Sequence, residues 1–278
     1  MIELGKINKL EVFRHSPHGV YLMDEEGEEV LLPNKYVPEH IEIDDEIEVF
    51  VYLDSEERPV ATTQKPKVML HQFACLKVSD VTSIGAFMDW GLVKQLFIPF
   101  REQQKRMNVG ERHIIYLYLD EDTDRLVGSS KYKKYLSKEE TTLKEGEEVD
   151  LLIAERTPIG FNAIINQKYL GLIYKNEVFQ SISKGSHVKG FVKAIRSDGK
   201  IDLSLQRQGY ANVEPNAEKI LEKLKWNNGY IRLNDKSEAA EIQSYLQMSK
   251  KTFKKAIGSL YKQRLITIEK HGIRLVED

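Results

Sequence analysis

The chain has 278 residues, a single cysteine and a formal net charge of −2 at pH 7. One cysteine excludes an intrachain disulfide framework and argues against a cysteine-based metal site. No run of about 18 apolar residues occurs, and the opening MIELGKINKLEV lacks the apolar core of a signal peptide. We therefore expect a cytoplasmic protein without a membrane span.

The small net charge conceals a strong asymmetry along the chain. Residues 1–64 carry 5 Lys and Arg against 16 Asp and Glu, a net charge of −11, whereas residues 65–278 carry a net charge of +9. A phosphate backbone responds to local potential, which moderate salt screens within about 10 Å. The later part of the chain can therefore bind nucleic acid even though the whole chain is slightly acidic.

One pattern, a glycine-led strand followed by a second apolar strand, occurs three times. It reads HGVYLMDEEGEEVLLPNKY around Gly19, IGAFMDWGLVKQLFIPF around Gly85 and IGFNAIINQKYLGLIYKNE around Gly160. The marker glycines are 66 and 75 positions apart, which suits separate domains rather than a solenoid. The spacing predicts three small β-barrels, at residues 1–64, 65–131 and 147–210, with a linker at 132–146.

The motifs GAFMDWG, GLIYKNE and VKGFVKAIRSDGKIDLSLQ resemble strand two, strand three and the last hairpin of S1 RNA-binding domains. These domains are five-stranded barrels of the OB class. Three of them followed by a basic, helix-rich tail resemble the conserved virulence factor B family of RNA-binding regulators in low-GC Gram-positive bacteria. The resemblance implies a bacterial protein that acts on gene expression, virulence included.

The first barrel departs from this pattern in its charge. Aligned on Gly19, it has Asp24 where the second barrel has Trp90. A carboxylate at a base-stacking position repels phosphate. We therefore expect this barrel to pack against its neighbours or to contact a protein or ribosomal partner rather than RNA.

In the second barrel, Phe87 and Trp90 match the outward aromatic positions of S1 domains. Stacking on such rings contributes about 1 to 3 kcal/mol per base and depends little on base identity. Arg101 and Arg125 are expected phosphate contacts. The histidine of the S1 pattern falls on Pro99, which removes a polar base contact, and Trp90 could instead fill the barrel.

The linker and the third barrel continue the basic character. Ser137 and Glu140 have the spacing of a capping box and predict a short helix in the linker. In the third barrel Tyr174 stands at the S1 histidine position, while Asn162 and Ile165 replace the two outward aromatics of strand two. The expected RNA contacts of this barrel are Tyr174, Lys175, Lys193, Arg196, Lys200 and Arg207.

The tail, residues 211–278, changes to a helical period. Helices are predicted over 218–225, after Asp235 and over 249–265 with Ser249 as cap, followed by a hairpin that turns at His271-Gly272. This order resembles a winged helix-turn-helix. Phe253, Ile257 and Leu260 form the predicted core face of the last helix. Its expected phosphate contacts are Lys250, Lys251, Lys254 and Lys255.

The sequence thus predicts a mostly β protein with an α+β tail, built from three S1-type barrels and a winged helix. Its favoured function is a regulator that binds single-stranded RNA with low sequence specificity. A winged-helix DNA-binding transcription regulator and a ribosome- or protein-binding adaptor are the alternatives. We expect no enzymatic activity, cofactor or metal, because the sequence has neither a phosphate-binding Gly-rich loop nor a nucleophile elbow.

Overall fold

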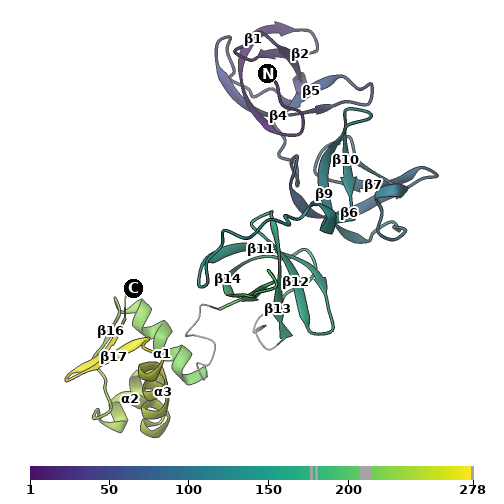
Figure 1. Ribbon diagram of the computed structural model, residues 1–278. Helices are drawn as coiled ribbons and strands as arrows, with labels where there is room; N and C mark the ends of the chain where they lie inside the picture. The colour runs from purple at the N-terminus through teal and green to yellow at the C-terminus, as the bar shows by residue number, and fades with distance from the viewer. Residues whose placement is uncertain (176–177, 179–180, 207–214, 277–278) are drawn as a thin grey trace. The chain divides into compact units, whose positions relative to one another are not determined.

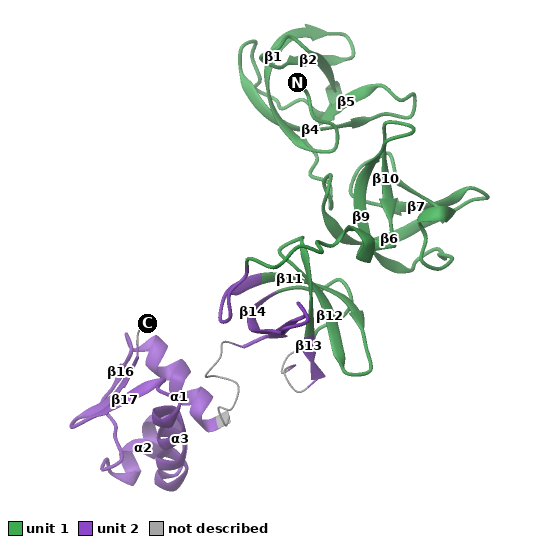
Figure 2. Cartoon of the chain, viewed as in Figure 1, with its two compact units in different colours: residues 1–142, 150–172, 181–188 green, residues 143–149, 173–180, 189–278 purple. Residues whose placement is uncertain are grey.

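The structure is a computed structural model that describes residues 1–175, 178, 181–206 and 215–276 (Figure 1). The chain divides into two compact units (Figure 2). One comprises residues 1–142, 150–172 and 181–188, and the other comprises residues 143–149, 173–180 and 189–278. The border between them runs through the third barrel.

The first barrel is a closed five-stranded sheet with the strand order β1-β2-β3-β5-β4. Its strands are β1 (Ile7–Ser16), β2 (Gly19–Met23), β3 (Glu29–Pro33), β4 (Glu46–Leu53) and β5 (Pro59–Thr62). The parallel pairing that closes the sheet is a single residue pair, Leu31 with Val60. Alternate residues of each strand, Val20 and Leu22 among them, fill the interior.

The second sheet has the same order of neighbours, read as β10-β9-β6-β7-β8, but it is not closed by hydrogen bonds. Its strands are β6 (Phe73–Val81), β7 (Gly85–Asp89), β8 (Leu96–Pro99), β9 (Arg112–Asp120) and β10 (Arg125–Ser129). The outer strands β8 and β10 still pack together. They are so close that a Cβ on Gly128 would lie 2.2 Å from Cδ1 of Ile98. In the first barrel a single residue pair joins the corresponding strands, and the loss of one such pair is enough to open a barrel. The closed second barrel that we expected is therefore an open five-stranded sheet.

The third barrel is closed, in the order β11-β12-β13-β15-β14. Its strands are β11 (Glu148–Arg156), β12 (Gly160–Ile165), β13 (Tyr169–Tyr174), β14 (His187–Ile195) and β15 (Ile201–Ser204). The prediction of three S1-like units is therefore confirmed in architecture, with the second unit open at one seam. The exact domain limits stay a prediction.

The marker glycines have a steric cause. Gly19, Gly85 and Gly160 are the first residues of β2, β7 and β12. A Cβ would lie 2.0 Å from the Leu32 carbonyl oxygen at Gly19 and 2.4 Å from the Ile98 carbonyl oxygen at Gly85. The neighbouring strand approaches too closely for any side chain, which explains the recurrence of glycine at this point.

The linker differs from its prediction. No helix begins at Ser137, whose hydroxyl accepts a hydrogen bond from the Glu139 amide in a non-helical segment. A short 3-10 helix lies earlier, at Tyr132–Tyr135. Tyr132 and Leu136 are buried in a cluster that also contains residues of β6, β9, β11 and β12. Burial of these apolar side chains decides the conformation, and the capping-box signal is overridden.

The C-terminal domain has three helices followed by a hairpin, as predicted, and a short strand lies between the first two helices. The elements are α1 (Pro215–Trp226), β16 (Tyr230–Ile231), α2 (Ala239–Leu246), α3 (Lys250–Lys262), β17 (Ile266–Glu269) and β18 (Gly272–Leu275). The Ser249 hydroxyl accepts a hydrogen bond from the Thr252 amide at 3.1 Å, as expected of a helix cap. Phe253, Ile257 and Leu260 are buried.

The turn of the wing lies one residue earlier than predicted. Glu269 pairs with Gly272, so Lys270 and His271 form the turn and Gly272 opens β18. A Cβ on Gly272 would lie 2.3 Å from the Ile231 carbonyl oxygen, which makes glycine necessary in the strand. Within the described residues, the helices are all too short or too polar to span a bilayer.

Candidate nucleic-acid interface

Two phenylalanine rings lie side by side on the outer face of the second sheet. Phe87 of β7 and Phe97 of β8 are directly opposite in the strand register, and their ring centroids are 5.2 Å apart. Their neighbours Met88 and Ile98 point inward and are fully buried, whereas both phenylalanines are half-buried. Phe97 was not among the predicted site residues, although the alternation of β8 could have indicated its outward position.

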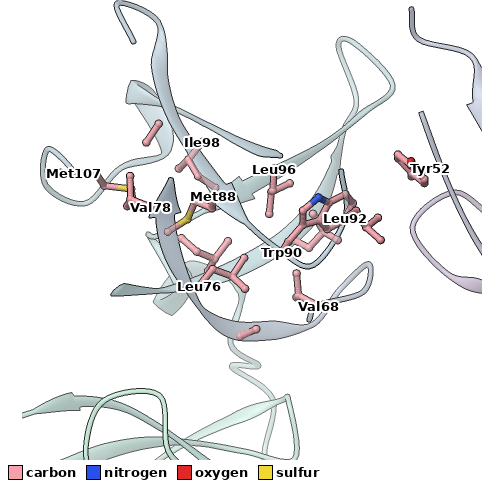
Figure 3. Packing of buried hydrophobic residues seen from close by; sticks show 14 of the residues in the cluster. Tyr52, Val68, Leu76, Val78, Met88, Trp90, Leu92, Leu96, Ile98 and Met107 are labelled. Atoms are coloured by element: carbon pink, nitrogen blue, oxygen red, sulfur yellow. The ribbon is translucent and has the colours of Figure 1, made fainter. Parts of the chain in front are cut away.

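Trp90 does not lie on this face. Its side chain is 2% exposed, and the indole N–H donates a hydrogen bond to the Lys94 carbonyl oxygen. The ring meets two aromatic rings of β4 edge-on, Phe50 at 5.7 Å and Tyr52 at 6.3 Å between centroids. Figure 3 shows Trp90 between the interior of the second sheet and Tyr52. The expected outward position of Trp90 is thus corrected, and the alternative, in which the ring fills a core, is observed.

Phe87 and Phe97 line a cleft of about 280 Å³ between the first and second barrels. From the second barrel, Ile84, Lys94 and Arg125 also line the cleft, and the first barrel contributes Tyr52, Leu53 and Glu57 among others. Ile84, in the β6–β7 loop, is 61% exposed. The cleft therefore combines aromatic and aliphatic walls with two cationic side chains.

The cationic side chains of the second barrel are engaged by acidic or main-chain oxygens. Arg101 contacts the carboxylate of Asp120 at 3.0 Å, and Arg125 forms an ion pair with Glu57 of the first barrel. The Lys94 ammonium donates to the Asp54 carbonyl oxygen at 2.7 Å. Burial lowers the pKa of Lys94, and the nearby charge of Asp54 partly opposes this effect.

In the third barrel, Tyr174 and Arg196 are brought together. The Arg196 guanidinium donates a hydrogen bond to the Tyr174 hydroxyl, and it also contacts the Asp202 carboxylate at 3.0 Å. Lys200 pairs with Asp198 at 2.7 Å. Lys175 is exposed and Lys193 is half-buried, whereas Arg207 lies outside the described residues.

The lysines of α3 are distributed as the helical pattern predicted. Lys251, Lys254 and Lys255 are exposed, and Lys250 is half-buried with its ammonium 3.5 Å from the Lys236 carbonyl oxygen. Sequence reasoning missed an exposed aromatic residue of the same domain, Trp226 at the end of α1. Its side chain is 86% exposed.

Among the residues that the structure describes, no group of three or more His, Cys, Asp or Glu side chains could hold a metal ion.

A family model for the S1 domain matches residues 4–64, and one for the CvfB-like winged helix domain matches residues 218–275. Conserved virulence factor B of Staphylococcus saprophyticus is 24% identical over 283 residues, which cover 99% of this chain and 95% of that protein. The resemblance to the conserved virulence factor B family is confirmed.

Two further proteins are similar over nearly their whole length. The uncharacterized protein YitL of Bacillus subtilis is 29% identical over 270 residues, which cover 93% of this chain and 89% of that protein. A crystal structure of a multidomain protein with nucleic acid binding domains from Streptococcus pneumoniae is 22% identical, with a TM-score of 0.45 and 98% coverage of both chains.

The S1 match falls on the acidic barrel, where Tyr21 corresponds to Phe87 when the two barrels are aligned on Gly19 and Gly85. Tyr21 of β2 lies under the guanidinium of Arg14, which is 3.6 Å from the ring centroid and contacts Glu29 at 2.8 Å. Asp24 accepts hydrogen bonds from the amides of Glu26 and Glu28 and so shapes the β2–β3 turn. S1 and winged helix domains are nucleic-acid-binding modules, and in this chain the second barrel offers an uncovered ring pair.

Proposed function

We propose that this protein binds single-stranded RNA with low sequence specificity and regulates gene expression post-transcriptionally. The observation that supports this proposal best is the pair of outward rings, Phe87 and Phe97, on adjacent strands beside a cleft that contains Arg125. Single-stranded bases stack on such rings whatever their identity. The regulatory part of the proposal is what the resemblance to the conserved virulence factor B family implies.

The winged helix adds positive charge rather than base reading. The first turns of α3 carry four lysines and neither Arg, Asn nor Gln, whose planar groups suit bidentate contacts with base edges. Lysine acts as a point charge on phosphate. We therefore infer that α3 contributes phosphate contacts of its own and does not select a DNA sequence.

The proposal is tested by comparing affinities for single-stranded RNA, single-stranded DNA and duplex DNA of equal length at several salt concentrations. Single-stranded RNA should bind most tightly. With about four to six phosphate contacts, the log-log salt slope should be about −3 to −4 at −0.7 per contact. Tighter binding of a particular duplex DNA would favour a transcription regulator, and binding of no nucleic acid would favour an adaptor.

A variant with alanine at Lys250, Lys251, Lys254 and Lys255 tests the winged helix in the same assay. These lysines lie away from the buried face of α3, so the variant should keep its melting temperature. It should weaken binding of different RNA sequences by similar factors and flatten the salt dependence. Arginine at the same four positions, which preserves the charge, is the control and should restore binding. Unchanged RNA affinity in the alanine variant would show that α3 does not contribute to RNA binding.

A further inference from the structure

The turn between β4 and β5 of the first barrel lies against the cleft of the second barrel. We call residues 54–58 the acidic turn. Its Glu57 carboxylate forms an ion pair with Arg125, and its Asp54 carbonyl oxygen accepts a hydrogen bond from Lys94. Arg125 and Lys94 both line the cleft beside the phenylalanine rings. The first barrel therefore holds both cations of this cleft in the structure.

These two contacts differ in how easily they can be exchanged. The side chains of Glu57 and Arg125 are each 51% exposed, and ion pairs in such positions contribute little and break readily. Lys94 is partly buried, and its contact is to the main chain, which keeps its place while the turn is folded. Arg125 is thus the exchangeable cation.

The cleft has the size and chemistry for a single nucleotide. Its volume of about 280 Å³ lies at the lower end of ligand pockets, which suits one base rather than a stacked strand. Phe87 and Phe97 offer ring faces, and the exposed Ile84 extends the apolar wall at the rim. A base on these rings would place its phosphate within reach of Arg125. Carboxylate and phosphate bind a guanidinium with the same geometry, so one can replace the other.

Building on the proposed RNA-binding function, we propose that this cleft is a single-nucleotide site in which Arg125 exchanges Glu57 for a phosphate of single-stranded RNA. The acidic turn then acts as an internal competitor for that phosphate. The first barrel, which we expected to take no part in RNA binding, regulates the affinity of the second without stacking a base itself.

The test is a Glu57→Gln variant, with Glu56→Gln as the matched control. Glu56 lies in the same turn and pairs with Arg58 at 2.9 Å, so its replacement removes the same charge without touching Arg125. Binding of a fluorescein-labelled oligouridylate is followed by polarisation. Glu57→Gln should tighten binding about two- to five-fold, which corresponds to the energy of a surface ion pair. Its salt slope should steepen by up to about 0.7, because one more net charge is exchanged.

A double-mutant cycle shows whether the gain passes through Arg125. Arg125→Gln alone should weaken oligouridylate binding, and adding Glu57→Gln to it should give no further gain. Equal increases in oligouridylate affinity from Glu56→Gln and Glu57→Gln would mean that only the loss of negative charge matters. That result would refute the proposed exchange at Arg125. A gain that persists without Arg125 would also overturn it.

The two proposals fail in distinguishable ways. If the wild-type protein does not bind oligouridylate, the RNA-binding function fails and the nucleotide site fails with it. If the wild type binds and Glu57→Gln does not differ from it, only the nucleotide site is overturned. Melting temperatures of all variants should match the wild type, since Glu56, Glu57 and Arg125 are exposed.

Discussion

Replacing Trp90 would separate its structural role from RNA binding. The ring is buried, donates one hydrogen bond and contacts two aromatic rings of the first barrel. A buried Trp→Ala change costs about 3 to 5 kcal/mol. Trp90→Phe keeps part of the ring contacts but loses the hydrogen bond, worth about 1 kcal/mol, and some packing. We expect it to lower the free energy of unfolding by about 1 to 2 kcal/mol.

The measurement is urea unfolding followed by circular dichroism, combined with oligouridylate binding under native conditions. Trp90→Phe should unfold at lower urea and bind RNA within about two-fold of the wild type, because the indole borders the cleft but is only 2% exposed, which leaves no ring face for a base to stack on. Phe97→Leu should do the reverse, losing up to about 1 to 3 kcal/mol of binding at little cost in stability. A stable Trp90→Phe variant with impaired RNA binding would refute this reasoning and return Trp90 to the binding face.

Iodide should quench Trp226 and spare Trp90, the only other tryptophan, so Trp226→Phe should lose nearly all of the iodide quenching. Substantial quenching in that variant would contradict the burial of Trp90. Burial also lowers the pKa of His113, an effect that its hydrogen bond to Glu111 partly opposes. The unfolded chain then binds a proton first, so stability should be retained above about pH 6.5 and decrease as the pH falls below it. His113→Gln should show a smaller drop in melting temperature between about pH 7.5 and pH 5.5 than the wild type, and an equal drop would assign the acid sensitivity to other groups.

The sequence predicted best what short-range sterics determine. Gly19, Gly85 and Gly160 start corresponding strands, and at the first two the close approach of a carbonyl oxygen excludes a side chain. The Ser249 cap and the buried face of α3 followed from local hydrogen bonding and the helical period. Such signals come from one helix or from two neighbouring strands of one barrel, so a single sequence shows them.

The site was predicted less well because it depends on contacts between domains. Strand alternation tells which side of its own sheet a residue faces, but not whether a neighbouring domain covers that side. Trp90 is covered by Phe50 and Tyr52, 38 or more positions away. Likewise, the charge count showed that residues 1–64 are acidic without showing that Glu57 lies on Arg125. Both misjudgements concern the border of the first and second barrels.

The core that the first and second barrels share also affects how the chain folds during its synthesis. Phe50, Tyr52 and Val60 belong to the same buried cluster as Val68, Trp90 and Leu92. A ribosome completes the first barrel before it reaches Trp90, and domains fold as units in that order. The surface that shields the indole is therefore ready when the indole emerges. In a circularly permuted chain that began at the second barrel, the same ring would be exposed on a nascent sheet with one unpaired seam.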